Sequence, residues 1–465
     1  MYRIDADYLV VGCGAAAMAF TDALVAARDE ARVVMVDRRH APGGHWLDAY
    51  PFVRLHQPSS YYGVNSLSLG DDAIDEHGPN QGLYERATAP EICGYYSRVM
   101  ERCLLPTGRV RYFPMCDYVG KQAGAHRFVS RASHRRYEVD ARAKLVDATY
   151  LQAAVPASTP PPFHIAPEAR CVPINELTQL TEPPEGYVII GAGKTAIDAC
   201  LWLLELGVAP NDIRWIRPRE GWWVNREYSQ GGELVGKLLE GLALQLEAAA
   251  RAISLEDLFR RLNDTGQLLR IDERVAPTMY KGATVSLDEL EQLRRIENVV
   301  RLGHVRRVGR DEIELAEGTI VTSPRHLHVH CAARGLNPAP AVPMFTADRI
   351  TLQPIRGGLI PFNAALVGYV EATRDDLAEK NRLCPPNPLP DSPLDWARSL
   401  VTGLSADYLW SKEPDINEWL ERSRLNASRG LRSRRDDPTL RSAWERFGAN
   451  VGPGLARLGR FLEAT

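Results

Sequence analysis

The chain has 465 residues, of which 45% are hydrophobic and 25% are charged, and its formal net charge is -3. This composition is typical of globular proteins, and the length allows two or three domains. The nearly balanced charge argues against nucleic-acid binding, which requires a clear basic excess. No apolar run approaches the ~18 residues of a membrane span. No signal peptide is visible, so we expect a cytoplasmic protein.

The cysteines argue against a redox dithiol. There are eight, they are scattered along the chain, and no two form a C-x-x-C pair. This spacing excludes the dithiol motif and a zinc ribbon. We expect no metal site and reduced, mostly buried thiols.

The N-terminal segment predicts a strand, a glycine turn, a helix and a second strand. An apolar run at residues 8–12 ends in glycine, a helical pattern covers 15–27, and a second apolar run covers 32–37. Three such elements within about 30 residues are typical of a βαβ unit.

The glycine turn of this unit fits the dinucleotide pattern G-x-G-x-x-A. Gly12 permits the tight turn, Gly14 permits close approach of a pyrophosphate, and Ala17 lets the helix pack on the strand. The pyrophosphate would lie at the helix N-terminus. Asp37 ends the second strand and would accept hydrogen bonds from the adenosine ribose.

The chain between the two glycine turns is less regular. Residues 40–83 predict long loops over a site, and 91–105 predicts a helix. We expect three strands of a small β-meander and then a buried strand, at residues 110–113, 127–130, 137–139 and 143–149. Residues 155–185 are rich in proline and predict a linker.

A second βαβ unit is predicted from a strand at 187–191, a helix at 196–206 and a strand at 213–217. Its turn again fits G-x-G-x-x-A, and we assign to the cofactor the residues Gly191, Gly193, Lys194, Thr195 and Ala196. A phosphate-binding Walker A loop would need glycine where Val188 stands, so that alternative fails.

The end of the next strand indicates which nicotinamide cofactor binds. It carries Arg217 and Arg219 in place of an acid. Arginine favours the 2′-phosphate of NADPH, whereas an acid would favour the free ribose hydroxyls of NADH. We therefore predict NADPH, with NADH less favoured. The alternative is that both arginines are ordinary solvated charges.

The C-terminal half is predicted to be mostly helical. Residues 233–300 predict a helical insert, residues 326–331 and 364–370 predict strands, and residues 395–465 predict a helical cap. Six arginines lie between 422 and 435, and we interpret that stretch as a solvated helix face.

Directly after Asp37 the chain resembles flavin-containing monooxygenases and their Baeyer–Villiger relatives. In that family an acid is followed by a basic residue and then by Gly-Gly, often with Trp. The resemblance implies that FAD is bound by Arg38, Gly43, Gly44, His45 and Trp46.

The resemblance extends to later segments. By position, the loop at 54–65 would reach the isoalloxazine edge, where Gln57 and Asn65 could bind flavin or substrate. Thr149 belongs to a short Ala-Thr segment that crosses between the domains near FAD. The family's Phe-x-Gly-x-x-x-His fingerprint has no match at 162–167, which lacks the glycine.

The sequence as a whole predicts an α/β fold with two Rossmann-like dinucleotide-binding domains, a β-meander, and a helical insert and tail. We place the first part of the FAD domain at 1–155. The NAD(P)H domain is placed at 185–335, with its helical insert at about 233–300. Residues 336–465 return to the FAD domain and form the C-terminal cap.

The resemblance implies an NADPH-using monooxygenase that oxidises a small organic substrate with dioxygen through a C4a-(hydro)peroxyflavin. A flavin reductase or dehydrogenase without oxygen insertion stays open, as does a dinucleotide-binding sensor. The sequence assigns no catalytic acid or base, no substrate and no oligomeric state.

Overall fold

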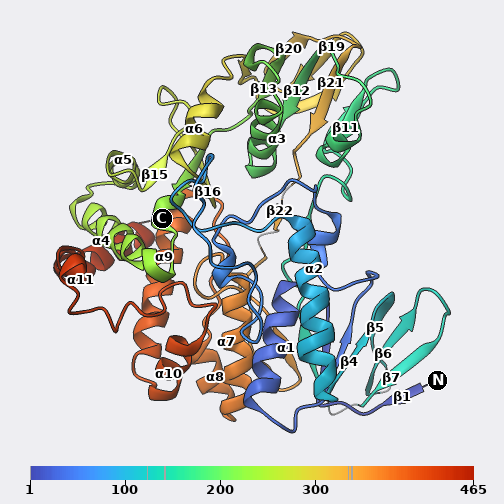
Figure 1. Ribbon diagram of the computed structural model, residues 1–465, viewed down its shortest axis with the longest axis vertical. Helices are drawn as coiled ribbons and strands as arrows, with labels where there is room; N and C mark the ends of the chain where they lie inside the picture. The colour runs from blue at the N-terminus through green and yellow to red at the C-terminus, as the bar shows by residue number, and fades with distance from the viewer. Residues whose placement is uncertain (1, 123, 141–142, 334, 337–338, 465) are drawn as a thin grey trace.

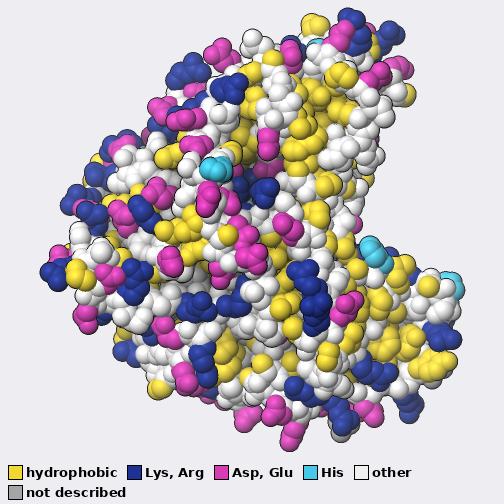
Figure 2. All heavy atoms as spheres, viewed as in Figure 1, with side chains coloured by type: hydrophobic (Ala, Val, Ile, Leu, Met, Phe, Trp, Pro, Cys, Tyr) yellow, Lys and Arg dark blue, Asp and Glu magenta, His cyan; other side chains and the backbone are white. Residues whose placement is uncertain are grey.

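The computed structural model describes residues 2–122, 124–140, 143–333, 335–336 and 339–464. Two lobes, each built on a parallel sheet, lie one above the other in Figure 1, and a group of helices lies to their side. Figure 2 shows a wide notch between the two lobes on the right of the view.

The lower lobe contains a five-stranded parallel sheet in the order β23-β8-β2-β3-β4. Strand β2 comes first along the chain among these five and lies in the middle of the sheet, so the strand order reverses beside it. Dinucleotides bind at such a point in α/β sheets. The strands are β2 (Tyr8–Val11), β3 (Val33–Val36), β4 (Val110–Phe113), β8 (Lys144–Asp147) and β23 (Arg349–Thr351).

The two faces of this sheet are covered by different layers, because side chains alternate along a strand. Tyr8 and Val10 face a helical layer, whereas Leu9 faces a small mixed sheet. The helices are α1 (Ala15–Ala27), α2 (Ala89–Val99) and α7 (Ile360–Thr373). The small sheet has the order β1-β7-β6-β5, from β1 (Tyr2–Ile4), β7 (Arg136–Val139), β6 (Ala125–Ser130) and β5 (Cys116–Gln122).

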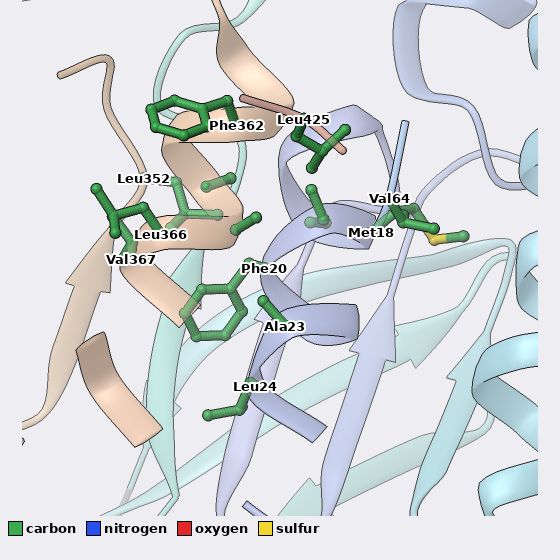
Figure 3. Close-up of a cluster of buried hydrophobic side chains, with 14 of the residues drawn as sticks. Met18, Phe20, Ala23, Leu24, Val64, Leu352, Phe362, Leu366, Val367 and Leu425 are labelled. Atoms are coloured by element: carbon green, nitrogen blue, oxygen red, sulfur yellow. The ribbon is translucent and has the colours of Figure 1, made fainter. Parts of the chain in front are cut away.

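Helices α1 and α7 lie side by side in the core of this lobe. Figure 3 shows Phe20 of α1 on the side of α7, the helix that carries Phe362 and Leu366, while Met18 of α1 lies beside Val64. A Cβ on Gly368 would lie 2.5 Å from the Phe20 carbonyl oxygen. Glycine at that position therefore permits the two helices to approach closely.

The upper lobe repeats the same plan with the parallel order β11-β21-β12-β13-β17. Tyr187 and Ile189 face helices, and Val188 and Ile190 face a second mixed sheet. The strands are β11 (Cys171–Pro173), β12 (Gly186–Ile190), β13 (Ile213–Ile216), β17 (Val299–Val300) and β21 (His326–His330). The helices are α3 (Lys194–Glu205) and α6 (Leu287–Arg294).

The remaining strands form the facing sheet of the upper lobe and two small sheets. The facing sheet has the order β10-β18-β19-β20, from β10 (His164–Ile165), β18 (Val305–Val308), β19 (Glu312–Leu315) and β20 (Gly318–Val321). The first small sheet, β15-β14-β16, contains β15 (Leu268–Leu269), β14 (Gly221–Asn225) and β16 (Met279–Val285). The second pairs β22 (Gly335–Leu336) with β9 (Ala153–Ala154).

Further helices flank the two lobes, and α11 packs along α4. Their bounds are α4 (Val235–Arg251), α5 (Leu255–Asp264), α8 (Leu377–Leu383), α9 (Pro393–Trp410), α10 (Pro414–Arg422) and α11 (Arg441–Glu463). Across the described part of the chain, no helix has both the length and the apolar character that crossing a membrane requires.

The predicted fold class is confirmed, since both Rossmann-like sheets are present, but several elements differ from the predictions. Strand β4 at 110–113 was predicted in the meander and instead extends the parallel sheet beside β3. The predicted strand at 364–370 lies inside α7. That helix is buried on nearly all sides, so its sequence lacks the polar face that marks a helix.

The proline-rich segment at 155–185 is not only a linker. It contributes β10 and β11, which lie at sheet edges where a proline such as Pro173 is tolerated. The insert at 233–300 is not entirely helical either, because it contains β15, β16 and β17. The arginine-rich stretch after Arg422 forms turns where a helix face was predicted.

Candidate dinucleotide sites

The first glycine turn leaves β2 and enters α1 in a conformation that only glycine adopts easily. Gly12 has φ of +101°, and its amide donates to the Val36 carbonyl at 2.8 Å. A Cβ on Gly12 would lie 3.1 Å from Cγ2 of Thr149. Thr149, predicted near FAD, therefore lies directly against this turn. Ala17 is fully buried at the base of the helix.

The Gly-Gly pair of the second predicted FAD segment packs on the same turn. A Cβ on Gly44 would lie 2.9 Å from Cα of Gly14, and one on Gly14 would lie 3.3 Å from Cα of Gly44. The Gly43 amide donates to the Cys13 carbonyl at 2.9 Å. The N-terminus of α1 is thus bordered by bare backbone, which suits a pyrophosphate approaching its N–H groups.

Asp37 lies at the carboxyl end of β3, beside the turn. One carboxylate oxygen accepts from the Cys13 amide at 2.5 Å and the other from the Arg39 amide at 2.7 Å. A carboxylate has further acceptor capacity for ribose hydroxyls. Asp37 is buried, whereas the neighbouring Arg38 is exposed to solvent.

His45 and Trp46 follow the glycine pair and stack on each other at 5.1 Å between ring centroids. The Trp46 indole N–H donates to the Tyr62 hydroxyl at 2.7 Å. Burial, reinforced by Arg39, lowers the pKa of His45 to about 4. His45 is therefore a neutral imidazole at physiological pH.

The loop at 54–66 presents one polar group without a partner. Nε2 of Gln57 is buried and has no hydrogen-bond partner among the described residues. The Asn65 side-chain oxygen accepts from Ser423 at 2.9 Å. Burial, followed by Lys194 and Arg86, lowers the pKa of His56 to about 3. Gln57 thus has donors available for a ligand.

A segment from the C-terminal part of the chain lies at the carboxyl edge of the same parallel sheet, and sequence reasoning missed it. The chain leaves the carboxyl end of β23 and turns into α7 through Arg356, whose amide donates to the Asn363 side chain at 2.9 Å. Nη1 of Arg356 donates to Asn426 at 2.8 Å. The pair Gly357-Gly358 before an apolar run was the available signal.

The second glycine turn repeats the first. Gly191 has φ of +145°, and a Cβ on it would lie 2.8 Å from the Cys331 carbonyl oxygen. The Gly191 carbonyl accepts from the Trp215 indole at 2.8 Å. Gly193 precedes α3, and Ala196 is fully buried on its first turn.

Lys194 and Thr195 lie at the start of α3, close to the lower lobe. Lys194 forms an ion pair with Asp198 one turn later on the helix. The Tyr50 hydroxyl donates to the other Asp198 oxygen at 2.7 Å. Burial, followed by Asp198, raises the pKa of Tyr50 well above its usual value, while a bond with Thr195 opposes this.

Arg217 occupies the predicted 2′-phosphate position at the end of β13. Its side chain is 3% exposed, and its guanidinium lies 4.7 Å from the centroid of the Trp215 ring. Nη2 lies 3.3 Å from Glu220, but Nε and Nη1 are buried without an acceptor among the described residues. Burial lowers the pKa of Arg217. Arg219 is exposed nearby along the chain.

A buried ionic cluster, also missed from the sequence, joins the two lobes. Glu289 caps α6, pairs with Arg86 of the lower lobe at 3.0 Å and also pairs with Arg226. Burial raises the pKa of Glu289, but the two arginines outweigh it and bring the value to about 2. Nothing in the local sequence relates residues so far apart.

No family model matches the chain. Its relatives include "Uncharacterized protein Rv2000" of Mycobacterium tuberculosis and "Uncharacterized protein Mb2023" of Mycobacterium bovis. Each is 49% identical over 424 residues, which cover 91% of this chain and 78% of the relative.

Solved structures with a related arrangement include an open crystal structure of cyclohexanone monooxygenase, with a TM-score of 0.48, 12% identity, and coverage of 80% of this chain and 88% of that one. A flavin monooxygenase from Stenotrophomonas maltophilia has a TM-score of 0.43, 14% identity, and coverage of 83% and 100%.

Proposed function

We propose that this chain, which belongs to the same protein family as Rv2000 of Mycobacterium tuberculosis, is an oxidoreductase. It would use FAD in its lower lobe and NADPH in its upper lobe. We further propose that it is a monooxygenase acting on a small organic substrate with dioxygen. The observation that carries the proposal is the presence of two complete dinucleotide turns, each at the reversal point of its own parallel sheet.

The residues at the first turn fit FAD. The touching backbones of Gly14 and Gly44 leave no side chain over the N-terminus of α1, where a pyrophosphate would bind. Asp37 would hold the adenosine ribose. Trp46 and the buried amide of Gln57 follow further along the same segment and would lie toward the flavin.

The residues at the second turn fit NADPH. Gly191 and Gly193 would accept its pyrophosphate, and the buried donors of Arg217, together with Arg219, would bind a 2′-phosphate. When bound, FAD would accept a hydride from NADPH, and in a monooxygenase its two electrons would then help to reduce dioxygen, with one oxygen atom entering the organic substrate and the other leaving as water. The protein supplies position and shields the reacting groups from water.

A reductase that does not insert oxygen is the second candidate. It is favoured by the segment at 162–167, where the monooxygenase fingerprint lacks its glycine. Phe163 there packs edge-on against His330 at 5.5 Å between ring centroids, and His164 begins an edge strand that pairs with β18. This segment serves as sheet and core, with no separate loop for a fingerprint histidine.

The test is reduction of the purified yellow protein by NADPH without oxygen, followed by oxygen. We expect loss of the flavin band at ~450 nm with NADPH, slower loss with NADH, and incorporation of labelled oxygen into an organic product. Gly191→Ala is the matched variant, because its Cβ would meet the Cys331 carbonyl. It should retain FAD and lose reduction by NADPH.

The outcomes separate the candidates. Reduction and reoxidation across a panel of amines, sulfides and ketones, without labelled oxygen in any product, would favour the reductase. A purified protein that contains no flavin and is not reconstituted by FAD would refute both enzymes. A flavin that neither NADPH nor NADH reduces would leave the dinucleotide-binding sensor.

A further inference from the structure

The carboxyl edge of the upper sheet holds a second arginine beside Arg217. Arg301 follows β17, which pairs in parallel with β13 through Trp215 opposite Val299 and Ile216 opposite Val300. Parallel neighbours end at the same edge of a sheet. Arg301 and Arg217 therefore leave the sheet next to each other, although the sequence separates them widely.

The two arginines share one carboxylate. Oε1 of Glu220 lies 2.7 Å from Nε of Arg301 and 3.3 Å from Nη2 of Arg217. Nη2 of Arg301 also donates to Asp272 at 2.8 Å. Two acidic partners thus fix the guanidinium of Arg301 through neighbouring donors.

Exposure distinguishes the members of this group. The side chains of Arg217 and Glu220 are 3% and 6% exposed, whereas that of Arg301 is 31% exposed. Arg301 is therefore held in place and still reachable by a ligand from solvent. A guanidinium has more donors than the two that these bonds use.

The charges of this group leave room for an anion. Among the described residues, Arg217, Arg301 and Arg274 share the two carboxylates of Glu220 and Asp272, which leaves one positive charge in excess. Nε and Nη1 of Arg217 are buried and have no acceptor in the part of the chain that the structure describes. Buried donors without partners are costly, so an anion seated against them is favoured.

We infer that Arg301 is a specificity-determining residue that binds the 2′-phosphate of NADPH together with Arg217. This inference rests on the proposed binding of NADPH at the second turn. In this fold the adenosine half of a dinucleotide binds beside the strand that follows the glycine turn and its helix. Here that strand is β13, and β17 is its neighbour in the sheet. Glu220 and Asp272 hold the guanidinium of Arg301 toward that place.

The experiment is calorimetric titration of the full chain with adenosine 2′,5′-bisphosphate and with 5′-AMP, which needs no turnover. Arg301→Gln should weaken adenosine 2′,5′-bisphosphate by about tenfold to a hundredfold and change 5′-AMP by less than about twofold. The matched control is Arg310→Gln, which removes an arginine that is 65% exposed in the same lobe. It should change neither affinity.

Arg301→Lys is a second variant that is expected to fold, because it keeps a positive charge beside buried Glu220. It should lose less affinity for the bisphosphate than Arg301→Gln, because lysine lacks the planar fork. Equal weakening of both ligands, or no weakening, would overturn the role of Arg301 while NADPH binding stands. A wild-type protein that binds neither ligand, or both equally, would overturn the proposed NADPH site as well.

Discussion

Gly14 and Gly44 touch through their backbones at the first cofactor site, although they belong to different segments. The 2.9 Å separation between a Cβ built on Gly44 and Cα of Gly14 is shorter than real side chains tolerate. Gly44 also has φ of +60°, which disfavours other residues. The same two residues therefore shape the proposed FAD site and hold together the two segments that border it.

Gly44→Ala should lower the free energy of unfolding by about 1–3 kcal/mol and deplete the purified protein of FAD. The added methyl group would push the 43–46 segment away from the N-terminus of α1. Urea unfolding and flavin absorbance of the purified protein measure the two effects.

The control is Gly448→Ala in helix α11, where no atom lies within 4 Å of the added Cβ. It should keep FAD and be neutral or stabilising, because alanine favours a helix. Full FAD content in Gly44→Ala would refute the role given to the glycine contact.

At the scale of elements, the loop at 59–66 is held in place by a segment from the C-terminal part of the chain. Nη1 of Arg424 donates to the carbonyls of Tyr62 at 2.9 Å and Val64 at 2.8 Å. Burial lowers the pKa of Arg424. Leu425 beside it is fully buried near Val64, as Figure 3 shows. The two distant segments thus form one unit beside the first site.

Arg424→Ala should destabilise the protein by about 1.5–3 kcal/mol, because it leaves two carbonyls without a charged donor. We expect faster hydrogen exchange at residues 59–66, measured by mass spectrometry. The control is Arg422→Ala, whose side chain is 68% exposed and lies 3.4 Å from Glu418 on the surface. Unchanged exchange in Arg424→Ala would show that the loop keeps its conformation without this contact.

At the scale of the whole molecule, the two lobes are joined by the segment that follows the first cofactor turn. Tyr50 bonds to Asp198 of α3, and Phe52 stacks on Trp202 of the same helix at 4.5 Å between ring centroids. The chain from Gly43 to Phe52 therefore runs from one predicted cofactor to the other. This contact ties α3, which begins at the second glycine turn, to the segment that follows the first.

Tyr50→Phe should reduce the free energy of unfolding by about 1–3 kcal/mol, because the carboxylate of Asp198 loses a buried donor. Hydrogen exchange should rise at residues 48–53 and at the start of α3. Tyr408→Phe is the control, since Tyr408 is 64% exposed. If exchange rises equally in both variants, or in neither, the Tyr50 hydroxyl does not hold the lobes together.

The sequence by itself determined the two glycine turns and the fold class. A βαβ unit can be predicted from local patterns. These patterns are the glycine positions, the run of apolar residues before each turn and Asp37 at the end of the next strand. The bounds of α1 were predicted to the residue, because its flanking strand and turn define both ends. The arginine at the end of β13 could likewise be read from the sequence.

Only the tertiary structure decided which distant segments meet. Helix α7 was predicted in part as a strand, since an apolar run buried on all sides has no period to distinguish it. The pairing of Gly14 with Gly44 and of Arg217 with Arg301, and the Arg86–Glu289–Arg226 cluster, also needed the fold. The physical reason is that burial and ion pairing depend on distance in space, which a local pattern does not record.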